Sequence, residues 1–137
     1  MATRASIGII IGGNVRSIYL HNDGYESHVL PILTGHYSTT KRVMALMALG
    51  DLSVLGEKLG TKHDFRSCPD NTCNAYGRDR GEDGVAATDW TREEFDGGSE
   101  GCAYLFDCDT EGGGRWLVRD YETGAWVAAF AALAAAT

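Results

Sequence analysis

Two short apolar segments rich in β-branched residues lie near the start of the chain and flank a polar turn. Residues 6–11 (SIGIII) and 15–21 (VRSIYLH) are separated by GGN at residues 12–14. Glycine and asparagine tolerate the positive φ angles of tight turns, so this pattern predicts a β-hairpin. A second hairpin is predicted from residues 103–106 and 116–121, whose polar connection ends in three glycines.

Helical spacing of apolar residues follows the first hairpin in two segments. The pattern of residues 28–37 predicts a helix, and Pro31 places its start close to residue 28 because proline is tolerated in the first turn. A second helix is predicted after Ser38 or Thr39, either of which can cap it. Gly50 suits the left-handed position that ends this helix.

The rest of the chain has weaker patterns. Residues 51–88 lack clear periodicity and predict a long irregular loop, with a short helical turn near residues 52–55. A short capped helix is expected at residues 91–95, where early acids complement the helix dipole. Together these elements predict one α+β domain over residues 1–124, with an antiparallel sheet of about four strands and two or three helices on one face. An Ala-rich tail or helix is expected at 125–137.

Length and composition indicate a soluble, unexported domain. The chain has 137 residues, of which 44% are apolar, and this is enough for one compact core. No window approaches the roughly 20 apolar residues of a membrane span, and the N-terminal apolar run is too short for a secretion signal. Four cysteines are too sparse for a disulfide scaffold, so a reducing compartment is expected.

Negative charge is concentrated in one segment. The net charge is −7, yet residues 82–111 alone contain ten acids and one base. Such a surface repels nucleic-acid phosphates and attracts basic protein grooves. The alternative, an acidic surface that only maintains solubility, stays open. The acids expected to contact a partner are Glu82, Asp83, Asp89, Glu93, Glu94, Asp96 and Glu100.

Metal binding receives little support from the sequence. Zinc knuckles usually place paired cysteines two to four residues apart, and the pairs here are more widely spaced. The thiols considered are Cys68, Cys73, Cys102 and Cys108, with His63 nearby. Residues 107–112 match the start of an EF-hand loop, but the residue at the twelfth place, Val118, is not a ligand. We therefore assign no metal or cofactor.

A mixed-charge loop offers a candidate pocket for a small ligand. Arginines can clamp a phosphate bidentately, and a histidine beside an acid adds a titratable group. The candidate ligand-binding residues are His21, Asp23, His63, Asp64, Arg78 and Arg80. In the structural alternative, Arg78, Asp79 and Arg80 pair with neighbouring acids and hold the loop in place. No hydrolase, P-loop or dinucleotide motif is present, so we expect no enzyme and assign no catalytic residue.

Several sequence blocks together resemble a family of small phage and prophage proteins of no assigned activity. The blocks are IYLHNDGY (18–25), GHY (35–37), LGDLS (49–53), KHDF (62–65) and YGRDRGE (76–82). The resemblance spans roughly residues 5–121. The family usually lacks cysteines at the places of Cys68 and Cys73, which weakens the zinc hypothesis further.

This resemblance implies a phage accessory protein acting in the host bacterial cytoplasm. Such proteins often counter host defence, and acidic ones can occupy the nucleic-acid groove of a CRISPR effector. The expected function is therefore anti-CRISPR-like inhibition of a host defence complex with a basic groove, without direct nucleic-acid binding through the acids. The alternative is a protein that sequesters a small nucleotide immune signal. The oligomeric state, including a homodimer, is left open.

Overall fold

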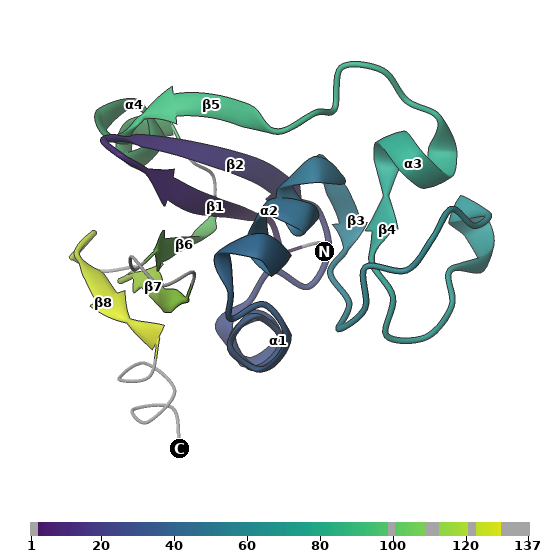
Figure 1. Cartoon of the computed structure of the whole chain (residues 1–137), viewed down its shortest axis with the longest axis horizontal. Helices are drawn as coiled ribbons and strands as arrows, with labels where there is room; N and C mark the ends of the chain where they lie inside the picture. The colour runs from purple at the N-terminus through teal and green to yellow at the C-terminus, as the bar shows by residue number, and fades with distance from the viewer. Residues whose placement is uncertain (1–2, 99–100, 109–112, 121–122, 130–137) are drawn as a thin grey trace.

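The computed structural model describes residues 3–98, 101–108, 113–120 and 123–129 and has an α+β fold (Figure 1). Within these residues, eight strands form one mixed sheet. The strands are β1 (Ala5–Ile11), β2 (Asn14–Leu20), β3 (Leu52–Val54), β4 (Asn74–Ala75), β5 (Thr88–Thr91), β6 (Cys102–Cys108), β7 (Gly114–Arg119) and β8 (Trp126–Ala128). The helices are α1 (Glu26–His36), α2 (Thr40–Ala48), α3 (Tyr76–Arg80) and α4 (Arg92–Gly98), with a 3-10 helix at Phe65–Ser67.

Both predicted hairpins are confirmed, but they belong to a larger sheet than expected. Strand β1 pairs antiparallel with β2, and β6 pairs antiparallel with β7. The hairpins join through parallel pairing of β1 with β6, and β2 also pairs parallel with β3. The strand order is β4-β3-β2-β1-β6-β7-β8, with β5 beside β2. The prediction of about four antiparallel strands is therefore wrong in number and in direction.

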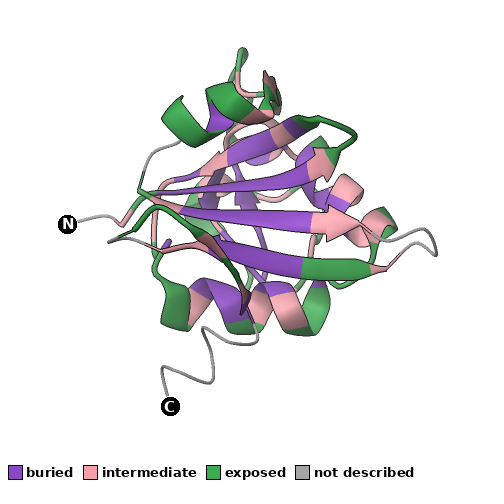
Figure 2. Cartoon of the chain, turned by 90° about the vertical axis from the view of Figure 1, so that its left-hand side faces the viewer, coloured by how far each residue is buried: buried purple, intermediate pink, exposed green. Residues whose placement is uncertain are grey.

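Helices cover both faces of the sheet, which corrects the prediction that they pack on one face. Helices α1 and α2 bury the larger core, which includes the directly paired residues Ile7 of β1, Ile18 of β2 and Tyr104 of β6. On the opposite face, Phe95 of α4 packs with Leu105 and a smaller set of strand residues. Figure 2 shows the strands between the two helical layers. Successive residues of β6 thus point alternately into the two cores, and both faces of this strand are buried.

The two N-terminal helices are confirmed, with one difference at the start of α1. This helix begins at Glu26, and Pro31 lies within it instead of in its first turn. Because Pro31 has no backbone N–H, the Ser27 carbonyl lacks the helical hydrogen bond that it would otherwise accept. Both residues are exposed. Helix α2 begins after Thr39, whose side-chain oxygen accepts a hydrogen bond from the Arg42 backbone N–H at 3.2 Å.

The segment 51–88 contains regular structure where a long loop was predicted. It holds β3, the 3-10 helix, β4 and α3, and the helical turn expected near residues 52–55 is instead strand β3. These elements are too short to produce a periodic sequence pattern. Strand β3 depends on its pairing with β2, and β4 depends on its pairing with β3.

The start of the Ala-rich segment joins the sheet. Strand β8 pairs antiparallel with β7, and residues 130–137 lie outside the described residues. None of the helices in the described ranges has the length and apolar character that a membrane span requires.

Asp51 fills a gap at the edge of β2. Strand β5 pairs with β2 at residues 14–17 and β3 pairs with it at Leu20, so Tyr19 lies between the two partners. The backbone N–H of Tyr19 donates to Oδ1 of Asp51 at 2.9 Å. Burial raises the pKa of Asp51 even though this hydrogen bond favours the ionised form.

Replacing Asp51 by asparagine is expected to raise the melting temperature at neutral pH. The amide oxygen can still accept from Tyr19, and the partly buried charge is removed. Because the folded-state pKa is raised, ionisation of Asp51 costs stability as pH rises from about 4, so the gain should vanish below about pH 4. Thermal unfolding of Asp51→Asn at pH 3 and pH 7 measures this. Asp83→Asn, which removes an exposed charge, is the control; an equal gain in both variants would contradict a local effect.

Candidate functional site

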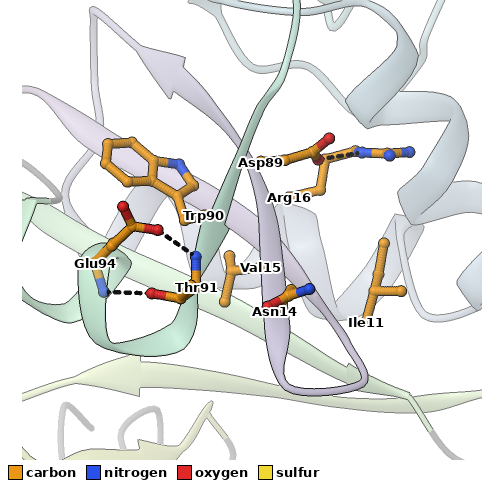
Figure 3. Close-up of a pocket in the computed structure, with 8 residues that line it drawn as sticks. All are labelled: Ile11, Asn14, Val15, Arg16, Asp89, Trp90, Thr91 and Glu94. Atoms are coloured by element: carbon orange, nitrogen blue, oxygen red, sulfur yellow. Dashed lines mark hydrogen bonds and ion pairs between the residues drawn. The ribbon is translucent and has the colours of Figure 1, made fainter.

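Strand β5 and the helix α4 that follows it carry four exposed acids. A reciprocal pair of hydrogen bonds fixes the start of α4: the Glu94 N–H donates to Thr91 Oγ1 at 3.1 Å, and the Thr91 N–H donates to Glu94 Oε1 at 2.8 Å (Figure 3). This is a capping box, which satisfies otherwise unpaired donors at a helix N-terminus. The hydrogen bonds from Thr91 lower the pKa of Glu94, so this acid is held ionised.

An aromatic cluster anchors α4 to the sheet. The ring of Phe95 is fully buried and lies 6.2 Å, centroid to centroid, from both Trp90 and Trp126. The indole N–H of Trp126 donates to Asp96 Oδ1 at 3.1 Å, and the Arg92 guanidinium lies over the Trp126 ring. The exposed face of the helix is therefore held in a fixed position relative to the sheet.

Basic side chains neutralise part of this surface. Arg16 Nε donates to Asp89 Oδ1 at 2.8 Å, and this hydrogen bond lowers the pKa of Asp89 (Figure 3). Arg92 Nε lies 3.4 Å from Asp96 Oδ1. Among the described residues, no ion pair is found for Glu93, which is exposed. We call Asp89, Glu93, Glu94 and Asp96 the α4 acidic surface.

The predicted partner-binding acids do not form one continuous surface. Glu82 and Asp83 follow α3, which Figure 1 places at the other end of the molecule from α4. Glu82 pairs there with Arg80 across 3.4 Å. Glu100 lies outside the described residues. Residues 82–98 therefore run along the molecule, and four of the seven predicted acids lie on α4 and the preceding strand β5.

Arg78, proposed for a ligand pocket, is used by the protein itself. Its guanidinium donates to the carbonyl oxygens of Leu59 at 2.7 Å and Cys73 at 2.9 Å. It also binds both carboxylate oxygens of Asp79, at 2.9 and 3.1 Å. These contacts connect three parts of the segment 51–88. The geometry favours the structural interpretation of this arginine over phosphate binding.

Asp79 is the centre of this network. Its side chain is fully buried, and its oxygens also accept hydrogen bonds from the backbone N–H groups of Ala75 and His63. Burial alone would raise the pKa of Asp79, but the hydrogen bonds from Arg78, Ala75 and His63 outweigh it and lower the pKa. The sequence singled out Asp79 only as a structural partner, and the structure supports that role.

His63 is enclosed by the same network. Its Nδ1 lies 3.0 Å from the Thr61 carbonyl oxygen, and its Nε2 lies 2.9 Å from Asn74 Oδ1 and 3.5 Å from Asp79 Oδ2. The side chain is 11% exposed. Both ring nitrogens face protein acceptors, so neither is directed at a ligand. Sequence reasoning missed Asn74 because a single asparagine in an irregular segment gives no signal.

The remaining candidate ligand residues lie outside this network. Asp64 caps the 3-10 helix by accepting from the Arg66 N–H at 2.9 Å. The Arg80 guanidinium lies 5.2 Å from the centre of the Phe65 ring. His21 Nδ1 lies 2.8 Å from the Tyr19 hydroxyl, and Asp23 is an exposed residue with φ of 56°. In the structure, the network around Asp79 brings only His63 and Arg78 of this set together.

The four cysteines are free thiols at different depths. Cys73 is buried beside the Tyr37 hydroxyl, and the other three are partly buried. Over the described ranges, no three His, Cys, Asp or Glu side chains are grouped closely enough to hold a metal ion. Of the EF-hand-like acids, those at 109 and 111 lie outside the described residues.

Comparison with known proteins finds no matching family model, no similar curated protein and no similar solved structure.

Proposed function

We propose that this protein is a non-enzymatic binding protein that docks its α4 acidic surface on a basic, nucleic-acid-binding groove of a partner protein. The observation that carries this proposal is the fixed position of α4. A capping box and an aromatic cluster hold the helix, so the positions from which its acids project are set before a partner binds. Preorganised side chains lose less conformational entropy on binding.

Charge supports a basic partner. The α4 acidic surface places four carboxylates beside three arginines, Arg16, Arg92 and Arg119, within a protein of net charge −7. Such a field steers positively charged surfaces toward α4 and repels phosphate backbones. Occupying a groove that normally binds DNA or RNA would block that groove. Together with the resemblance to phage proteins, this supports inhibition of a host defence complex in the bacterial cytoplasm.

A matched pair of charge reversals tests this proposal. Candidate effector complexes are co-expressed with the wild-type protein and recovered by pull-down at low and high salt, and their nucleic-acid binding is then measured. Glu93→Lys should weaken binding about tenfold, because it reverses an exposed charge for which the described residues show no ion pair, and the weakening should shrink in high salt. Asp83→Lys makes the same charge change at the other end of the molecule and should change affinity less than about twofold.

Two outcomes would contradict the proposal. Equal weakening by both reversals would indicate that only total charge matters. Unchanged nucleic-acid binding by every effector that the protein captures would exclude occupation of a nucleic-acid groove.

A further inference from the structure

Strand β5 has an open edge whose hydrogen-bonding groups can be assigned. The Arg92 N–H donates to the Gly13 carbonyl at 3.3 Å, in the same register in which Thr91 lies opposite Asn14. In an antiparallel ladder, hydrogen-bonded pairs alternate with non-hydrogen-bonded pairs. Thr88 and Trp90 therefore direct their backbone groups toward β2. Asp89 and the neighbouring Thr91 direct theirs away from it.

No described strand pairs with this outer edge. Glu94 already accepts the N–H of Thr91, and the C=O of Thr91, as the cap of α4, accepts the first hydrogen bond of that helix, which leaves the N–H and C=O of Asp89 for an incoming chain. A pocket of about 380 Å³ lies beside these residues and is lined also by Ile11 and Asn14 (Figure 3). The other two edge strands offer less: β4 has two residues, and β8 runs into the segment beyond the described residues.

We propose that an extended, basic segment of the partner adds to the edge of β5 as an antiparallel strand. This inference rests on the proposed function and specifies how the α4 acidic surface is recognised. Residues directly opposite each other in a sheet place their side chains on the same face. A basic residue opposite Asp89 therefore meets a carboxylate that is still 69% exposed. The next residue of the segment lies opposite Trp90, on the other face.

Charge selects the occupant. Glu94 lies at the open edge itself, where its carboxylate accepts the Thr91 N–H. The preceding residue, Glu93, is also on the first turn of α4. A neutral or acidic strand would meet these charges without compensation. An alternation of basic and apolar residues matches Asp89 on one face and the indole of Trp90 on the other.

Backbone-methylated peptides test the strand addition without altering the protein. The probe is a ten-residue peptide of alternating arginine and valine, and its binding is measured by calorimetry and by Trp fluorescence. Two isomers carry N-methyl groups on all arginines or on all valines, so charge and composition are identical. In an antiparallel ladder with arginine opposite Asp89, the arginine N–H groups face β5. Methylation of arginine should weaken binding at least tenfold, and methylation of valine should leave it nearly unchanged.

Variants of Asp89 supply a second test. Asp89→Pro removes the outward N–H, the charge and the contact with Arg16, whereas Asp89→Asn removes the charge and keeps an amide oxygen that can still accept from Arg16. Proline is tolerated where an edge strand faces solvent. We expect Asp89→Pro to bind the unmethylated peptide at least tenfold more weakly than Asp89→Asn. The peptide isomers decide the question even if the proline variant does not fold.

Strand addition would be overturned if the two isomers bound with equal affinity, whether or not methylation weakened both. It would also be overturned if the unmethylated peptide did not bind. Failure of the proposed function looks different. If both isomers bind equally and Glu93→Lys weakens both, charge-based docking holds while strand addition is rejected. If the isomers differ as expected but no effector groove is blocked, the edge binds basic strands and the proposed function is rejected.

Discussion

Replacement of Asp79 by alanine should lower the melting temperature by roughly 10–20 °C. The fully buried carboxylate accepts hydrogen bonds from Arg78 and from two backbone N–H groups. Without it, Arg78 would be a largely buried charge with no counter-ion. Removing one partner of a buried ion pair costs about 3–5 kcal/mol, and 1 kcal/mol shifts the melting temperature of a domain of this size by about 3–4 °C.

Asp64 provides the matched control. It is also an acid of the segment 51–88, but it is exposed and only caps a three-residue 3-10 helix. Loss of such a cap costs about 1 kcal/mol, so Asp64→Ala should lower the melting temperature by only a few degrees. Similar shifts in the two variants would contradict the central role of Asp79.

The effect of Asp79 should depend on pH. Its pKa is lowered in the folded protein, so its contribution to stability is complete above the unfolded-state pKa of about 3.9 and is lost as pH falls through the folded-state pKa. The difference in melting temperature between wild type and Asp79→Ala should therefore be constant near neutral pH and shrink below about pH 4. Thermal unfolding across pH 2.5–7 measures it. A difference that grows in acid would show that another group controls the stability of this segment.

Local signals in the sequence predicted local structure. The N-terminal hairpin follows from the GGN turn at residues 12–14 between β-branched segments, and Thr39 caps α2 as its side chain and position suggest. The parallel pairing of β1 with β6 joins residues nearly one hundred positions apart and has no local signature. One signal was available: residues 103–106 are apolar without alternation, which is typical of a strand covered on both faces.

The candidate site was predictable in charge and not in geometry. The acids of the segment 82–111 are evident from composition, and a capped helix is predicted at residues 91–95, where the spacing of Thr91 and Glu94 matches a capping box. The pairing of Arg16 with Asp89 spans 73 residues and depends on the register of β2 against β5. Tertiary pairing of this kind decides which acids remain available to a partner.

A second large effect is expected at Gly50. This residue follows α2 and lies against the loop that leads into β5. Its φ is +74°, and a Cβ at this position would collide with the carbonyl oxygen of Val85. That same oxygen accepts a hydrogen bond from the Asp51 N–H at 2.8 Å. An added methyl group must therefore force the two segments apart and weaken the bond between them.

Gly50→Ala is expected to lower the melting temperature by roughly 10 °C, as the sum of left-handed strain of about 1–2 kcal/mol and the cost of displacing the Val85 loop. The control is Gly84→Ala, at φ +76° in the same loop, where a Cβ meets no atom within 4 Å. This variant should lose only the stability that corresponds to the left-handed strain, and it should melt roughly 3–5 °C below wild type. Because the displaced loop leads directly into β5, Gly50→Ala should also weaken binding of the arginine–valine peptide more than Gly84→Ala does. Equal losses of stability would mean that backbone conformation, and not the contact with Val85, explains why glycine is needed at position 50.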